Sequence, residues 1–359
     1  MLDFTSALYL GLDHASRRLP AWKHLTLGKP RALQTPRGAV RVERQLAALI
    51  GCERALLATS TLHLFFDLFA MLGRSGVNLF LEANAYPIAR WGVERAACAG
   101  TQVTTFPQHN VHALQKALDA VDDKLPVIVA DGYCPLRGEP APIAEYLAVA
   151  TARGGLVVMD DTQALGIFGK PGRPSAYGTG GGGSMQRAAL TSDRLIVGSS
   201  LAKGFGVPVA VLAGSAAMVE RFEQQSETRV HCSPPSVAVI AASARALAIN
   251  RRYGDAVRMK LAEQVLHFRR GLRRLGLVAT PGLFPMQPVR LPKQVAAQDL
   301  HEELRERGIE AVLHGGERGK QAWISFIVTA RHTAEEIDTA LAHLASALAM
   351  EKRMNSRTS

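Results

Sequence analysis

Short apolar runs rich in β-branched residues alternate, from about residue 40 onward, with longer segments whose apolar residues recur at helical spacing. Strands are predicted at residues 78–82, 102–106, 126–130, 156–160, 194–198 and 209–213. A helix is predicted at residues 141–153, where apolar side chains follow a proline-bearing start. Strands that alternate with helices favour parallel pairing in a sheet covered on both faces. The pattern therefore predicts a doubly wound α/β core.

The pattern changes after Pro234 and Pro235. Two long helices are predicted at residues 238–250 and 253–275, and a last helix at 334–349, opened by Thr333 with acids in its first turn. Between them lie a strand at 289–291, a helix at 297–307 and a strand at 322–328. We therefore expect an N-terminal arm (1–39), a large domain (40–235) and a small α+β C-terminal domain (236–359).

Composition narrows the class of protein. The chain has 359 residues, 47% of them hydrophobic, so it can bury a sizeable core and is neither disordered nor a small disulfide scaffold. Its net charge of +11 favours an anionic partner, but basic residues do not interleave with aromatic ones, and nucleic-acid binding is not expected. The eleven histidines lack the spacing of a metal site.

Cysteine usage and hydropathy bear on location. The four cysteines form no CxxC pair, and no charged start followed by an apolar run opens the chain. No apolar stretch approaches the roughly 20 residues of a membrane span. We expect a cytoplasmic protein that does not enter a membrane.

Two segments place a polar group just beyond a predicted buried strand: LVVMDDTQALGIFG at 156–169 and IVGSSLAKGFG at 196–206. Ligands of open α/β sheets bind at such strand ends. Asp160 could hold a protonated ring nitrogen there. Lys203, among apolar residues and glycines, would have the lowered pKa that a Schiff-base amine needs. This pair is the minimal set for pyridoxal 5'-phosphate (PLP); an ordinary ion pair between Asp160 and Lys203 is the alternative, and spacing alone does not decide.

The same segments resemble the α-oxoamine synthase branch of the fold-type I PLP-dependent transferases. DDTQALGIFG resembles that family's DEAHxxGxxGxxG segment, and GSSLAKGFG resembles its GTLSKAFG lysine motif. Blocks at residues 9–14, 42–65, 131–150 and 328–338 follow in the family's order. The resemblance implies a large, doubly wound, mostly parallel-sheet domain with a smaller α+β C-terminal domain, a homodimer, and PLP as cofactor.

Carried onto this sequence, the resemblance implies a set of residues around the cofactor ring. Lys203 would form a Schiff base with PLP, and Asp160 would bind the pyridine nitrogen. Tyr86 stands where the family stacks a histidine on the ring, and an aromatic face can serve there. Gln163 replaces a second family histidine; it can donate a hydrogen bond but cannot act as a titrating acid or base.

The resemblance also implies phosphate-binding residues. The start of a helix predicted at 61–72 suits a dianion, because its amides and dipole point at the ligand. The expected residues come from three segments: Ser60, Thr61 and Leu62; Ser200; and, across the dimer interface, His231 and Ser233. A helix-capping or core role is the alternative for Ser60, Ser200 and Tyr86.

One departure from the family concerns the substrate. The family's RLR strand, which supplies a carboxylate-binding arginine, reads Trp323-Ile324-Ser325 here. A substrate carboxylate would need another bidentate guanidinium; the candidates are Arg229, Arg318 and Arg331. Otherwise the amine substrate is unusual, and Trp323 would offer it a flat face suited to a bulky or cationic group.

A glycine run at residues 178–183 invites a nucleotide-loop interpretation, but it lacks the lysine and hydroxyl residue that end a Walker motif. We expect a flexible flap beside the active site instead.

The leading hypothesis is a PLP-dependent transferase of α-oxoamine synthase type. It would form a Schiff base with an amine or amino acid and a carbanion that an acyl-CoA or another electrophile captures. Because Gln163 and Ser325 replace features of acyl-CoA condensation, an aminotransferase or a lyase is the alternative. A non-catalytic PLP-fold binding protein is a second alternative, against which the presence of both Lys203 and Asp160 argues.

Overall fold

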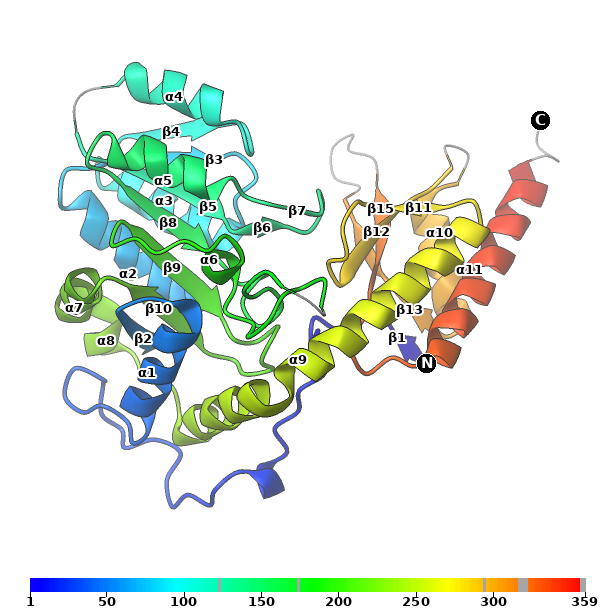
Figure 1. The fold of residues 1–359 in the computed structure, drawn as a ribbon, viewed down its shortest axis with the longest axis horizontal. Coiled ribbons are helices and arrows are strands. Elements are labelled where there is room, and N and C mark those ends of the chain that lie inside the picture. Colours follow the sequence, from blue (N-terminus) through cyan, green and yellow to red (C-terminus); the bar gives the residue numbers. More distant parts are fainter. Residues whose placement is uncertain (122–123, 173–174, 293–294, 316–321, 356–359) are drawn as a thin grey trace.

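A seven-stranded sheet forms the centre of the larger part of the molecule (Figure 1). The computed structural model describes residues 1–121, 124–172, 175–292, 295–315 and 322–355. In spatial order the strands are β2 (Arg54–Ala58), β10 (Ala210–Gly214), β9 (Leu195–Ser200), β8 (Leu156–Asp160), β5 (Pro126–Asp131), β3 (Asn78–Glu82) and β4 (Val103–Phe106). The predicted strands are confirmed to within two residues; β2 was not predicted.

Parallel pairing joins all neighbours in this sheet except β10, which runs antiparallel to both β9 and β2. β10 runs antiparallel to β9 because the connection between these two strands is short. Only nine residues separate Ser200 from Ala210, too few for the crossover that a parallel pair requires. This short reversal carries Lys203 across the carboxyl edge of the sheet.

Helices cover both faces of the large sheet. On one face α1 (Ala39–Ile50), α4 (Val111–Asp119) and α5 (Ile143–Thr151) share a core with the start of α9. On the other, α2 (Thr61–Gly73), α3 (Pro87–Cys98) and α7 (Ala216–Gln225) bury a second apolar cluster. Short elements complete this part: β6 (Tyr133–Cys134) paired with β7 (Glu139–Pro140), α6 (Ser184–Arg187) and α8 (Glu227–His231). The predicted doubly wound core is confirmed.

The C-terminal part is a four-stranded antiparallel sheet backed by helices (Figure 1). Its strands, in spatial order, are β11 (Val278–Ala279), β12 (Met286–Arg290), β15 (Trp323–Ile327) and β14 (Val312–His314). Its helices are α10 (Ala297–Glu306) and α11 (Ala334–Asn355). Thr333 and Glu336 cap α11 reciprocally, Oγ1 accepting from the Glu336 amide at 3.2 Å and Oε2 from the Thr333 amide at 2.8 Å.

One helix, α9 (Val237–Arg274), runs for 38 residues through both parts, so the prediction of two helices was wrong. The expected break at residues 251–252 does not occur because nothing there interrupts the backbone. Gly254 continues the helix, and its missing side chain makes room for Asn250 and Arg258. A buried guanidinium thus sits in the middle of the helix, where Arg258 donates to the Gly166 carbonyl at 2.9 Å.

The first residues of the expected arm join the C-terminal part. Strand β1 (Leu2–Asp3) pairs in parallel with β13 (Ile309–Glu310), and Phe4 is fully buried, stacked on the His332 ring at 4.3 Å. A short 3-10 helix (Ser16–Arg18) follows.

The glycine run is held in place rather than forming a free flap. The Gly180 amide donates to Asp255 at 2.8 Å, and its carbonyl accepts from Asn250 at 2.9 Å. The Gly166 amide donates to the Gly181 carbonyl at 2.8 Å. The run therefore serves as a packed link between α9 and the segment that follows Asp160.

Candidate active site

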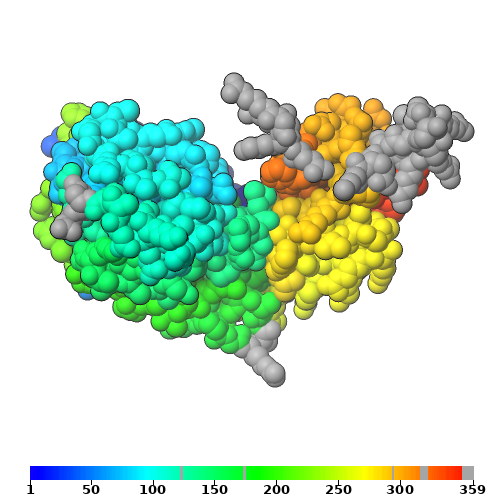
Figure 2. Space-filling view, turned by 90° about the horizontal axis from the view of Figure 1, so that it is seen from above, coloured from blue at the N-terminus to red at the C-terminus, as the bar shows by residue number. Residues whose placement is uncertain are grey.

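A cavity of about 830 Å³ lies where the carboxyl ends of the large-sheet strands face the C-terminal sheet. Segments following β3, β5, β8 and β9 form one side, and Met286, His314 and Trp323 form the other. Figure 2 shows the surface hollowed between the cyan and green part of the molecule and the smaller yellow and orange part. Open α/β sheets bind ligands at this edge.

Lys203 and Asp160 both line the cavity. Burial lowers the pKa of Lys203, while the carboxylates of Asp160 and Asp131 oppose the change. Burial raises the pKa of Asp160, and its hydrogen bonds with Thr162 and the charge of Lys203 oppose that shift. The Thr162 amide donates to Asp160 Oδ1 at 3.0 Å. Among the ion pairs of the described chain, none joins Asp160 to Lys203, so the structure does not form the simple pair that was the alternative interpretation.

Tyr86 brings an aromatic face to the same space. The Lys203 ammonium lies 5.5 Å from the centre of its ring, and the ring is half exposed. Its position is set by Asp131, whose two carboxylate oxygens each accept from the Tyr86 amide at 3.1 Å. Burial raises the pKa of Asp131 well above its usual range, and the charge of Asp160 adds to the shift.

Sequence reasoning missed Asp131 and Thr162. Asp131 pairs with Asp160 in the register of β5 and β8, so two carboxylates end adjacent strands. The signal was present, because Asp131 follows a predicted strand just as Asp160 ends one. Thr162 links the segment after β8, which carries Asp160, to the end of β9, because its Oγ1 accepts from the Ser200 amide at 3.0 Å.

Of the residues expected to bind the phosphate, some line the cavity and others do not. Thr61, the first residue of α2, and Ser200, the last of β9, line it. Ser60 caps α2 by accepting from the His63 amide at 3.3 Å, but neither Ser60 nor Leu62 lies on the cavity wall. The amino end of α2 therefore opens on the cavity through Thr61.

His231 and Ser233 lie outside this cavity. Ser233 lines a separate hollow of about 20 Å³, and its carbonyl accepts from Thr59 at 2.9 Å, beside the start of α2. His231 is the last residue of α8 and is exposed. Neither contacts the cavity of its own chain.

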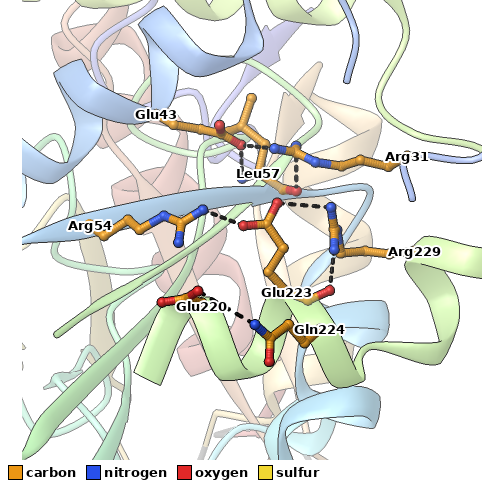
Figure 3. Close-up of polar contacts among 8 residues, drawn as sticks. All are labelled: Arg31, Glu43, Arg54, Leu57, Glu220, Glu223, Gln224 and Arg229. Carbon is orange, nitrogen blue, oxygen red and sulfur yellow. Dashed lines mark hydrogen bonds and ion pairs between the residues drawn. The ribbon is translucent and has the colours of Figure 1, made fainter. Parts of the chain in front are cut away.

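The candidate replacements for the missing arginine are engaged elsewhere. Arg229 donates to Glu223 at 2.9 Å, and Glu223 also pairs with Arg54, in the cluster drawn in Figure 3. Arg331 donates to the Gly11 carbonyl at 2.7 Å. Neither lines the cavity. Arg318 lies outside the described residues.

Two aromatic rings form the cavity wall at β15, the strand where the resemblance would put the family's arginine, and at its neighbour β14. Trp323 stacks on His314 with ring centres 5.3 Å apart and planes 10° apart, and Met286 adjoins them on the cavity wall. Burial lowers the pKa of His314, which favours the neutral ring. Ser325, the residue at the second arginine position, is fully buried.

Two arginines do line the cavity, and each has a partner. Arg90 donates to the Ala83 carbonyl at 2.6 Å, and Arg137 pairs with Glu139. Within the part of the chain that the structure describes, the cavity thus offers no guanidinium without a partner.

These residues fit PLP. Asp160 supplies a buried carboxyl for a ring nitrogen, Lys203 an amine of lowered pKa, and Tyr86 a ring face, while Thr61 brings the amino end of a helix. A doubly wound sheet with this arrangement at its carboxyl edge defines a PLP-dependent transferase of fold type I.

Comparison with known proteins specifies the family. Residues 1–344 match the family model described as aminotransferase class I and II, and the chain belongs to this family. It is 27% identical to the 8-amino-7-oxononanoate synthase of Alcanivorax borkumensis over 96% of this chain and 88% of that protein. The 8-amino-7-oxononanoate synthase of Sodalis glossinidius is 28% identical with the same coverage.

Solved structures share the fold. Serine palmitoyltransferase of Sphingomonas wittichii superposes with a TM-score of 0.85 at 19% identity, covering 98% of this chain and 88% of that one. The 8-amino-7-oxononanoate synthase of Francisella tularensis gives a TM-score of 0.75 at 18% identity, with 98% and 99% coverage. The chain is therefore an α-oxoamine synthase-like, PLP-dependent transferase, as the sequence predicted.

Proposed function

We propose that the protein joins an acyl group to the carbon beside the amine of its substrate, with PLP held by Lys203. The observation that carries this proposal is that Lys203 and Asp160 face one cavity at the carboxyl edge of the sheet. When bound, PLP supplies an electron sink for negative charge on that carbon. The names of the similar synthases and of serine palmitoyltransferase support acyl transfer over the aminotransferase and lyase alternatives.

In this proposal each side chain has a defined task. Lys203, with its lowered pKa, has a neutral amine available to hold the cofactor and to take a proton from the substrate. Asp160 keeps a proton on the ring nitrogen by remaining anionic beside it. Tyr86 covers one ring face, and Thr61 and Ser200 donate hydrogen bonds to the phosphate at the start of α2.

A direct test reconstitutes the purified protein with PLP and supplies candidate amines together with acyl-CoAs. We expect a free thiol to be released in step with amine consumption, and none with the Lys203→Ala variant. Consumption of a 2-oxo acid without thiol release would overturn the proposal in favour of transamination.

We propose further that the amine substrate is not glycine, alanine or serine. The reason is the wall of Trp323 and His314, where a carboxylate clamp would otherwise stand. A bidentate guanidinium contributes about 1.5–3 kcal/mol, so its loss weakens binding about 10- to 150-fold. Titrating the PLP-loaded protein with each amino acid and following its absorption checks this. Saturation by any of the three below millimolar concentration would show that a clamp exists.

We also propose a homodimer whose interface covers the outer faces of α2, α3 and α8. Four large apolar side chains are exposed there: Leu62, Phe66, Trp91 and Val230. Exposed apolar side chains gathered on adjacent elements are typical of an interface. In such a dimer α8, which ends at His231, meets the other copy, and we expect His231 and Ser233 to reach that copy's cofactor; their position outside their own cavity is consistent with this.

Light scattering on the purified protein tests the dimer. Trp91→Glu is expected to yield a monomer with weakened PLP binding. Tyr253→Glu is the matched control, because both side chains are 52% exposed and Tyr253 lies on α9, away from the proposed interface. A fully active monomeric wild-type protein would refute the assignment.

The structure also bears on location. In the described part of the chain, no helix combines the length and apolar character required to cross a membrane. All four cysteines are free thiols, which supports our proposal of a reducing, cytoplasmic location.

A further inference from the structure

Gln163 presents the cavity with either of two chemically opposite groups. Its side-chain amide carries one acceptor oxygen and one nitrogen with two donor hydrogens. Which end faces the cavity decides whether the ligand group seated against Gln163 accepts or donates. The family's histidine at this position could change its protonation; an amide changes its function only by rotating.

Tyr9 bonds to the oxygen end of that amide. Its hydroxyl donates to Gln163 Oε1 at 2.8 Å, across 154 residues of sequence. Among the described residues the Tyr9 hydroxyl has no other hydrogen-bond partner. Burial raises the pKa of Tyr9, so the hydroxyl keeps its proton and remains a donor.

The Tyr9 ring cannot readily move away from this contact. It is 2% exposed and packs edge-on against Phe284, with ring centres 5.3 Å apart. Its backbone carbonyl accepts from the Ala330 amide at 2.9 Å. Both neighbours belong to the C-terminal part, whereas Gln163 lies in the turn that follows β8 of the large sheet, so Tyr9 links the two parts across the site.

We propose that Tyr9 is a positioning residue that holds the Gln163 amide with its N–H groups toward the cavity. The ligand group against Gln163 is then a hydrogen-bond acceptor, such as an anionic oxygen of the cofactor or substrate. This proposal rests on the proposed function in taking the cavity as the PLP site. It assigns Tyr9 a role that packing alone would not require.

The experiment compares Tyr9→Phe with a matched control, Tyr177→Phe. Tyr177 is also 2% exposed, and its hydroxyl donates to the Leu283 carbonyl at 2.6 Å. The difference is that Gln163, the partner of Tyr9, lines the cavity, whereas Leu283 does not. We expect Tyr9→Phe to weaken PLP binding to the apoprotein about 2- to 10-fold and to shift the absorption band of bound PLP. Tyr177→Phe is expected to lower the melting temperature similarly and to leave both readouts unchanged.

A double-mutant cycle separates positioning from packing. In a Gln163→Ala background, Tyr9→Phe is expected to have no further effect on PLP binding, because the amide it orients is gone. An undiminished effect in that background would overturn the proposal. So would a Tyr9→Phe protein whose PLP affinity and absorption match the wild type.

A readout without PLP keeps this proposal distinct from the proposed function. In the apoprotein, the side-chain ¹⁵NH₂ signals of Gln163, identified by their loss in Gln163→Ala, should shift on Tyr9→Phe and not on Tyr177→Phe. Unshifted signals refute the role of Tyr9, whereas a wild-type protein that binds no PLP refutes the proposed function.

Discussion

Replacing Asp160 by Asn removes one negative charge from the end of β8 while keeping the size of the side chain. The Thr162 amide, which donates to Oδ1 at 3.0 Å, can donate equally to the Asn oxygen. The fold should therefore be unchanged. What changes is the partner offered to the ring nitrogen of PLP, which becomes a neutral amide in place of a carboxylate.

The size of the effect follows from the burial of this group. Asp160 is 7% exposed, so solvent screens its interaction with a bound cation only weakly. A hydrogen bond to a charged group is worth about 1.5–3 kcal/mol. At about 1.4 kcal/mol per pK unit, Asp160→Asn should lower the pKa of the ring nitrogen by about 1–2 units. Turnover should fall about 10- to 150-fold if the proton is needed in the transition state.

The assay is a pH titration of ¹⁵N-labelled PLP bound to the protein, followed by the chemical shift of the ring nitrogen. Asp131→Asn is the control, because Asp131 ends the neighbouring strand in register with Asp160 but bonds to the Tyr86 amide instead. We expect a clearly smaller change for Asp131→Asn. A ring-nitrogen pKa that Asp160→Asn leaves unchanged would refute the assignment, and so would an equal change in both variants.

Three further predictions concern the cofactor and the buried charges. Lys203→Ala should lose the imine absorption of the PLP-loaded protein, and borohydride reduction of the wild type should label the peptide that contains Lys203, as peptide mass spectrometry would reveal. Burial raises the pKa of Asp161 from 3.8 to about 7, so between these pH values the folded state binds more protons than the unfolded state. The free energy of unfolding should therefore fall by about 4 kcal/mol as the pH rises from 3.8 to 7. Asp161→Asn should remove this decline, measured as melting temperature at pH 5 and pH 8. Glu43→Gln should destabilise the fold by about 3–5 kcal/mol in chemical denaturation, since it leaves the buried Arg31 without its counter-charge, and a loss below 1 kcal/mol would contradict that reasoning.

Local pattern was sufficient to find the sheet and two candidate residues that the structure brings to one cavity. Asp160 ends a buried strand and Lys203 closely follows another, and β-branched runs identify such strands without knowledge of the rest of the fold. Because parallel strands bring their carboxyl ends to one edge, the meeting of these two side chains could be expected. The same reasoning would have found Asp131 had it been applied to β5.

Continuity of the long helix was harder to predict. The segment around Arg251 is polar because the helix turns an exposed face there, and a polar stretch looks the same whether it is a loop or the outer side of a helix. The packing of Gly254 against Asn250 and Arg258 accompanies the unbroken course of the helix through this segment. That packing depends on neighbours that a local pattern does not contain.

By itself, then, the sequence determined the α/β class and the strand ends that carry Asp160 and Lys203, and its resemblance to a known family indicated the cofactor. Only the tertiary structure decided what surrounds them: the bond from Tyr9 to Gln163, the aromatic wall of Trp323 and His314, and the engagement of Arg229 away from the cavity. The physical reason is the distance along the chain over which the interactions act. Strand and helix patterns arise from interactions between residues a few positions apart, whereas the partners of a side chain in the site come from segments that folding alone brings together.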